Sequence, residues 1–169
     1  MKKNATNGFT LVELMVTVSV AAILLVIAVP SFSVFLMNNR MATQANDLIS
    51  ALNLARSEAV RRGATVTVCA SSNQATCIGG WAQGWVVRDP AGAVIRVQQA
   101  LSGGSTLVGG ANVATTVAYT TMGNTTIPVG SAIAQTTLTL CPPAPAAVQG
   151  RAIQIESTGR VASAPVACP

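Results

Sequence analysis

The chain has 169 residues, of which 50% are hydrophobic and 9% charged, and a formal net charge of +5; this length fits one compact domain with an appended element. Histidine is absent, and Lys2 and Lys3 are the only lysines. Beyond residue 8 these absences exclude histidine bases, histidine metal ligands and lysine nucleophiles, so we predict a protein that is not an enzyme and holds no cofactor or metal.

The first predicted element is a membrane-spanning helix. A short basic segment, residues 1–8, leads directly into an apolar run over residues 9–29 that only Glu13 interrupts with a charge. As a helix this run is roughly 31 Å long, about the thickness of the hydrocarbon core of a bilayer. The two lysines before the run place the N-terminus in the cytoplasm. We therefore expect one pass through the inner membrane, with the rest of the chain outside; the alternative is a generic signal anchor.

The start of the apolar run carries a recognisable motif, GFTLVE at residues 8–13. It resembles the prepilin peptidase signature of type IV pilins and type II secretion pseudopilins. The resemblance implies cleavage between Gly8 and Phe9 by prepilin peptidase and N-methylation of Phe9. It divides the chain into a leader peptide (residues 1–8), a transmembrane and assembly helix (9–35) and a periplasmic head (36–169).

Glu13 and Pro30 are the two unusual residues of the predicted span. A carboxylate in an apolar span costs about 2.5 to 3.5 kcal/mol, so it needs a cationic partner. After cleavage the nearest cation is the amino group of Phe9, from the same or a neighbouring subunit. The resemblance implies that Glu13 pairs with the amino group of the neighbouring subunit, and this pair would set the register between subunits in a filament. The alternative is an acid that faces lipid headgroups. Pro30 lacks a backbone donor and should kink or loosen the helix; it matches a proline common in pilins.

A second, amphipathic helical stretch is predicted over residues 36–62. Glu58 and Arg62 are spaced as an i,i+4 ion pair, and Gly63 suits the position that ends a helix. Apolar residues recur at alternating spacings of four and three, which indicates one helix face packed on the head: Met41, Ala45, Leu48, Leu52, Ala55 and Ala59.

From residue 64 onward the apolar pattern changes to a period of two, which predicts strands. Turn residues at 89–92 and 157–159 indicate hairpins and a mainly antiparallel sheet, whereas the Gly-, Ser- and Thr-rich stretch 102–116 is predicted to be a loop. Trp81 and Trp85 are interpreted as core residues rather than surfaces for base stacking. The fold class is therefore α+β, with predicted strands at residues 65–69, 85–88, 94–97, 116–119, 137–140 and 152–155.

Residues 52–63, LNLARSEAVRRG, resemble the GspH/FimT family in particular, and spaced matches continue as far as Gly159 and Arg160. The resemblance implies a type IV pilin-like fold and a minor pilin with other major and minor pilins as partners. Such a protein enters the pilus fibre or its priming and tip complex and supports pilus biogenesis and twitching motility. The alternative is a minor pseudopilin of a type II secretion system, located in a pseudopilus.

Four cysteines in an exported head indicate disulfides rather than free thiols, and four cysteines allow three connectivities. We favour Cys69 with Cys77, which closes a short loop, and Cys141 with Cys168, which ties the C-terminus to the sheet. In the chain-entropy model these closures contribute about 2.5 and about 3.5 kcal/mol.

The tail over residues 150–169 resembles the region through which some FimT proteins are thought to bind DNA in natural transformation. Only Arg160 matches the basic residues of that pattern. Double-stranded DNA is thus a candidate partner, with Arg151, Arg160, Arg88 and Arg96 as candidate contacts. The alternative is that these arginines are solvated residues at strand ends.

Overall fold

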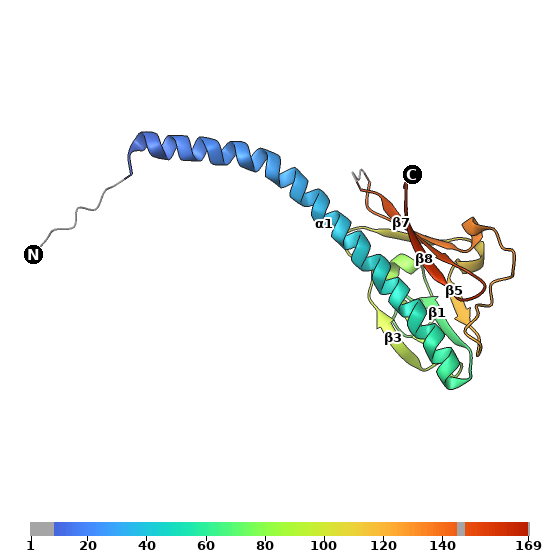
Figure 1. Ribbon diagram of the computed structural model, residues 1–169. Helices are drawn as coiled ribbons and strands as arrows, with labels where there is room; N and C mark the ends of the chain where they lie inside the picture. The colour runs from blue at the N-terminus through green and yellow to red at the C-terminus, as the bar shows by residue number, and fades with distance from the viewer. Residues whose placement is uncertain (1–8, 145–147, 169) are drawn as a thin grey trace, which may run out of the picture. The chain divides into compact units, whose positions relative to one another are not determined.

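The computed structural model describes residues 9–144 and 148–168. The predicted leader, including Gly8, lies outside the described residues. The chain divides into two compact units, Met1–Leu36 and Met37–Pro169, and the second is called the head below. Figure 1 shows the elements of each unit.

One helix, α1 (Leu11–Arg62), spans both predicted helical stretches and continues through Pro30. Thr10 precedes the helix as its N-cap residue, and its Oγ1 accepts a hydrogen bond from the backbone N–H of Glu13 at 3.2 Å. At its other end Gly63 has a φ of 61°, and the N–H of Ala64 donates to the carbonyl of Ala59 at 3.2 Å. This is the Schellman arrangement, in which a glycine ends the helix. The predicted end at Arg62 is confirmed.

The head contains two four-stranded antiparallel sheets, with strand orders β3-β2-β1-β5 and β4-β6-β7-β8. The sequence predicted a single sheet. Three short 3-10 helices, η1 (Trp81–Gln83), η2 (Ala111–Val113) and η3 (Ile133–Gln135), connect the strands. The strands are β1 (Val66–Ala70), β2 (Trp85–Arg88), β3 (Val94–Gln98), β4 (Thr106–Gly109), β5 (Thr116–Tyr119), β6 (Thr137–Cys141), β7 (Gly150–Ile155) and β8 (Val161–Val166).

Two of these strands correct the sequence-based prediction. The stretch predicted as a loop contains β4, which pairs with β6 from Thr106 opposite Cys141 to Gly109 opposite Leu138. The tail contains β8, which pairs with β7 along its whole length. Both lie at an edge of their sheet, where one neighbouring strand supplies the pairing and few large side chains are needed. Edge position also tolerates Pro165 in β8.

Both predicted hairpins are confirmed. In the turn between β2 and β3, the Asp89 side chain accepts a hydrogen bond from the N–H of Ala93 at 2.8 Å. In the turn between β7 and β8, the N–H of Glu156 donates to the carbonyl of Arg160 at 2.9 Å. These turns fix the register of two strand pairs.

A single apolar core joins the head's part of α1 to both sheets. All six residues of the predicted helix stripe, from Met41 to Ala59, are buried in it. Trp81 and Trp85 are each only 1% exposed, which confirms their interpretation as core residues. The indole Nε1 of Trp81 donates a hydrogen bond to the carbonyl of Val113 at 2.9 Å, so Trp81 also fixes the connection before β5.

Candidate assembly segment and head surfaces

The described part of the first unit, residues 9–36, is predominantly apolar. Its large hydrophobic side chains from Phe9 to Leu36 are 48–80% exposed. An 18-residue window of α1 has a mean hydropathy of 2.7, so the helix is long and apolar enough to cross a membrane. Glu13 is the only charged residue between Phe9 and Leu36. A helix that is hydrophobic all round belongs in lipid or among other apolar helices, so this unit is the candidate assembly segment.

Glu13 lies in the first turn of α1. There a carboxylate is favoured by the unpaired N–H groups and the dipole of the helix. Thr10 and Glu13 have the spacing of a capping box, and the Thr10 half of that box is formed. Thr10 was not among the residues predicted from the sequence, although the spacing Thr-x-x-Glu at residues 10–13 is the signal of such a cap. Glu13 lies four residues after Phe9 in the sequence, and the amino group of Phe9 would be the new N-terminus after cleavage at the predicted site.

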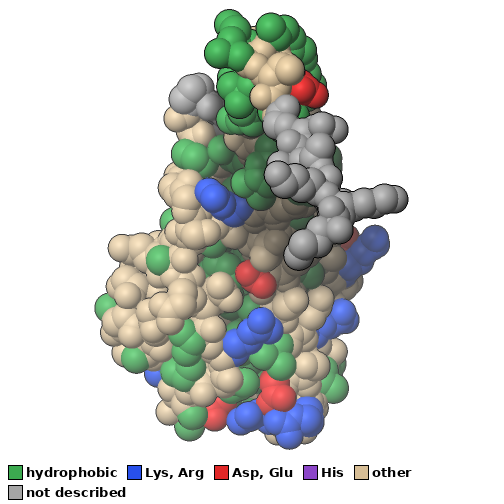
Figure 2. All heavy atoms as spheres, turned by 90° about the vertical axis from the view of Figure 1, so that its left-hand side faces the viewer, with side chains coloured by type: hydrophobic (Ala, Val, Ile, Leu, Met, Phe, Trp, Pro, Cys, Tyr) green, Lys and Arg blue, Asp and Glu red, His purple; other side chains and the backbone are tan. Residues whose placement is uncertain are grey.

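The four candidate DNA-contacting arginines do not converge. Arg88 and Arg96 lie on β2 and β3 of one sheet, whereas Arg151 and Arg160 belong to the other sheet. Arg151 is near the start of β7, and Arg160 lies in the turn after its end. Because a strand rises about 3.3 Å per residue, most of the length of β7 lies between Arg151 and Arg160, and the two side chains do not start from the same place. On the face drawn in Figure 2, basic and acidic side chains of the head are interspersed.

Several other arginines are engaged within the head. Glu58 accepts hydrogen bonds from both Arg61 and Arg62 at 2.6 Å, which confirms the predicted Glu58–Arg62 pair. The hydrogen bond from Arg61, followed by that from Arg62, lowers the pKa of Glu58 to about 2. Arg62 also reaches Asp89 at 3.4 Å. These contacts tie the end of α1 to the turn between β2 and β3.

Arg56, which the sequence analysis did not single out, joins α1 to the turn between β7 and β8. Its Nε donates to the carbonyl of Gly123 at 3.0 Å, and its Nη2 donates to the carbonyl of Thr158 at 3.3 Å. Gly159, which has a φ of 83°, lies against the Gly123 carbonyl and the Nε of Arg56. A Cβ at Gly159 would collide with the Gly123 carbonyl oxygen. Arg56 and Gly159 therefore position the turn that carries Arg160.

The sheet β4-β6-β7-β8 carries two shallow grooves of about 470 and about 600 Å³, both lined in part by Thr139. The described residues that line these grooves are all uncharged. Within residues 9–144 and 148–168, no three His, Cys, Asp or Glu side chains are grouped so that they could hold a metal ion.

Two disulfides staple the head. Cys69 is bonded to Cys77 with a Cα–Cα distance of 5.4 Å, and Cys141 to Cys168 with a distance of 5.9 Å. These are the pairs that we favoured from the sequence. The first bond ties the loop after β1 to that strand, and the second ties the residues after β8 to the end of β6.

Comparisons with known proteins agree on one family. Residues 44–159 match the family described as Type II transport protein GspH, and residues 3–29 match the Prokaryotic N-terminal methylation motif. No curated protein matches the chain at a significant level.

Two solved structures are similar to this chain, both crystal structures of the type IV minor pilin FimU from Pseudomonas aeruginosa PAO1. The first is 21% identical with a TM-score of 0.59 and covers 78% of this chain and 92% of that chain. The second, in another space group, is 20% identical with a TM-score of 0.55 and covers 73% and 92%. At this identity the similarity shows a shared fold. With more than half of its length matched by the GspH family and the pilin fold in place, the chain belongs to the GspH family of minor pilins and pseudopilins, which are structural proteins and not enzymes.

Proposed function

We propose that this chain is a minor type IV pilin. It is made as a prepilin, cut between Gly8 and Phe9 and N-methylated at Phe9. Residues 9–35 then hold it in the inner membrane, with residues 36–169 in the periplasm, until it enters the pilus fibre or the priming complex at its tip. In this role it supports pilus biogenesis and twitching motility. The observation that carries the proposal is the uncovered apolar part of α1 with one carboxylate in its first turn.

The pairing of Glu13 is the chemical core of this proposal. A carboxylate surrounded by apolar side chains and lipid is stable only beside a positive charge. The amino group of Phe9 in a neighbouring subunit supplies that charge when the apolar helices pack together. The pair forms only when the two helices have the correct axial offset, so it selects one register of assembly.

The head's part of α1 supports the same role. Opposite its buried stripe, the helix exposes a row of residues that carry no charge, and such residues can be covered by a neighbouring subunit without removing a charge from water. This row consists of Asn39, Thr43, Asn46, Ser50, Asn53 and Ser57.

Replacing Glu13 with glutamine should lower incorporation into sheared pili at least about tenfold, because the neutral amide cannot form an ion pair with the protonated amine of Phe9. Leader cleavage and membrane insertion should stay at wild-type level. Quantitative immunoblots of the fibre and membrane fractions measure both. Ser19→Ala is the matched control in the same segment, since the Ser19 hydroxyl is already bonded to the Met15 carbonyl at 2.8 Å. Equal incorporation of E13Q and wild type would contradict the proposal that Glu13 selects the register of assembly.

A second candidate function is that of a type II secretion pseudopilin, which the GspH family match favours. The two functions differ in the machine that retains the protein. In the native host, a tagged chain should co-purify with pilus subunits and lose its fibre fraction when the pilus assembly genes are deleted. Retention that depends instead on the secretion genes would assign it to the pseudopilus.

We further propose that the tail contacts double-stranded DNA through Arg160, with Arg151, Arg88 and Arg96 adding weaker attraction. The full chain in detergent should then shift a DNA duplex at low salt and lose the shift at moderate salt, because phosphate contacts release counterions. Arg160→Glu should abolish the shift, while Arg96→Glu, on the other sheet, should only reduce it. Equal effects would indicate a diffuse basic surface, and no shift at high protein concentration would exclude DNA binding.

A further inference from the structure

The two sulfurs of the Cys69–Cys77 disulfide are in different surroundings. Cys69 lies on the central strand β1, paired with Val86 on one side and Thr116 on the other, and is fully buried. Cys77 lies in the loop that follows β1 and is exposed. An external reagent can therefore reach Cys77 but not Cys69.

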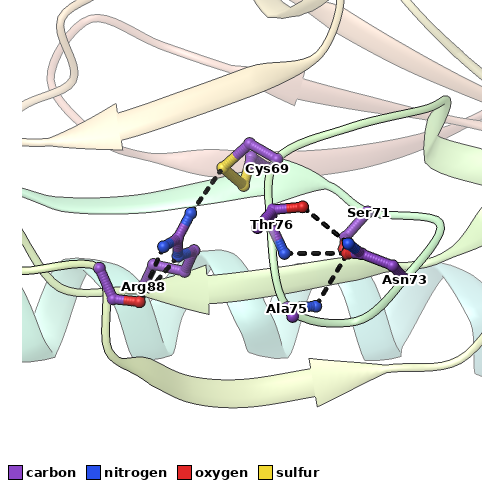
Figure 3. The surroundings of a disulfide bond; sticks show 8 residues. Cys69, Ser71, Asn73, Ala75, Thr76 and Arg88 are labelled. Atoms are coloured by element: carbon purple, nitrogen blue, oxygen red, sulfur yellow. Dashed lines mark hydrogen bonds between the residues drawn. A yellow bond between two sulfur atoms is a disulfide. The ribbon is translucent and has the colours of Figure 1, made fainter.

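The loop that carries Cys77 keeps its shape through contacts other than the disulfide. The side-chain oxygen of Asn73 accepts hydrogen bonds from the N–H groups of Ala75 at 3.0 Å and Thr76 at 2.9 Å, as Figure 3 shows. The N–H of Ser72 donates to the carbonyl of Ile78 at 2.8 Å. We therefore expect Cys77 to stay near its observed position when the sulfur–sulfur bond is open.

Arg88 places a positive charge beside Cys77. Its Nη1 lies 3.9 Å from Cys77 Sγ, and its Nε and Nη2 donate to the carbonyl of Gly92 at 3.0 and 2.8 Å. Figure 3 shows Arg88 next to the disulfide. Because the carbonyl of Gly92 holds the guanidinium, the position of this charge does not depend on the disulfide. The adjacent carboxylate, Asp89, is engaged instead with Arg62 and with the N–H of Ala93. A thiolate at Cys77 would thus be stabilised, as thiolates beside arginine are.

We propose that Cys77 is the thiol through which this disulfide forms. The Cys77 thiolate attacks the disulfide of an external oxidant, either a disulfide-carrying protein or a small-molecule disulfide, and expels one of the oxidant's sulfurs as a thiolate. The Cys69 thiolate then attacks Cys77 Sγ and expels the second. Two protein thiols are oxidised to one disulfide, the oxidant leaves as two thiols, and the protons lost by the cysteines end on those thiols.

The same asymmetry protects the finished bond. A reducing thiolate that attacks the exposed Cys77 sulfur must expel the Cys69 thiolate into a buried, apolar position. Burial disfavours the thiolate and raises the pKa of such a thiol, which makes it a poor leaving group. Attack on the Cys69 sulfur is blocked because that sulfur is covered. The finished bond is therefore slow to reduce.

The test of the charge uses the full chain in detergent with Cys69→Ser, so that Cys77 is the free thiol. Its rate of alkylation by iodoacetamide across pH should give a pKa below the ordinary value of about 8.5. Adding Arg88→Gln should return the pKa of Cys77 to that value. The alkylation rate at pH 7 should then fall about threefold for each pKa unit regained, because the smaller thiolate fraction is partly offset by the greater nucleophilicity of a thiolate with a higher pKa. Arg96→Gln, on the neighbouring strand, is the matched control and should change neither. An unchanged pKa in R88Q would overturn the role of Arg88.

A second test needs no substitution at the buried cysteine. The wild-type chain is reduced, exposed to oxidised glutathione, quenched with acid at early times and mapped by mass spectrometry. Glutathione should be found on Cys77 in at least tenfold excess over Cys69, and this preference should vanish in urea, where neither burial nor Arg88 acts. Equal labelling of both cysteines in the folded chain would overturn the proposal.

Discussion

Replacing Trp81 with alanine should lower the free energy of unfolding of the head by about 3–5 kcal/mol, the usual cost of removing a large aromatic side chain from a core. Trp81 is 1% exposed and touches the core shared by α1 and both sheets. A loss of this size is a large part of the stability of an ordinary domain. Urea unfolding followed by circular dichroism and by the fluorescence of the remaining Trp85 measures it.

The two tryptophans provide a sharper comparison than alanine alone. Trp81 Nε1 donates to the Val113 carbonyl, whereas the buried Nε1 of Trp85 has no partner among the described residues. Trp81→Phe should therefore cost more than Trp85→Phe by about 1–3 kcal/mol, because only the first leaves a buried group without its partner. Equal costs would mean that the Trp81 hydrogen bond contributes nothing net.

Most of α1 could be predicted because its signals are local. The apolar run, the stripe from Met41 to Ala59 and the terminal Gly63 are each recognised from residues within a single continuous stretch of sequence. The structure contains the first two in α1 and places Gly63 directly after its end. Burial then follows from the pattern itself, since a helix with one apolar face must cover that face.

Strands β4 and β8 could not be predicted in the same way. The sequence of β8, VASAPV, has few of the β-branched and aromatic residues that favour strands. Its extended form comes from pairing with β7 across the hairpin and from the Cys141–Cys168 bond that holds the residues beyond it. These are partners elsewhere in the chain, so a local pattern does not contain them.

The roles of the arginine side chains could not be predicted from the sequence for the same reason. Arg88 was predicted as a candidate DNA contact, and the sequence did not show that its guanidinium is bound to Gly92 and lies beside Cys77. Arg56 gave no signal in the sequence, because its partner Thr158 lies 102 residues further along the chain. An arginine's role depends on the carbonyls and sulfurs near its tip, which a one-dimensional pattern does not specify. The carboxylate Glu13 was recognisable because its whole surroundings, the apolar span, are local.

Replacing Gly159 with alanine should have the second large effect on the head, a loss of at least about 2 kcal/mol in the free energy of unfolding. A positive φ alone costs an L-residue about 1–2 kcal/mol, and here the new Cβ would also collide with the carbonyl oxygen of Gly123. That carbonyl accepts the hydrogen bond of Arg56, so relief of the collision must move the turn away from α1. The same denaturation experiment measures the loss.

Gly130→Ala is the matched control for this prediction. Gly130 has a φ of 81°, close to that of Gly159, but a Cβ there would meet no atom within 4 Å. Its replacement should lower the free energy of unfolding only by the cost of a positive φ for alanine, about 1–2 kcal/mol. The difference between the two variants isolates the packing of the β7–β8 turn against α1. If G159A also displaces Arg160, its DNA shift should weaken while that of G130A stays at wild-type strength. Equal stability losses in the two variants would show that the turn can move away from α1 at no cost, and that Arg56 does not fix its position.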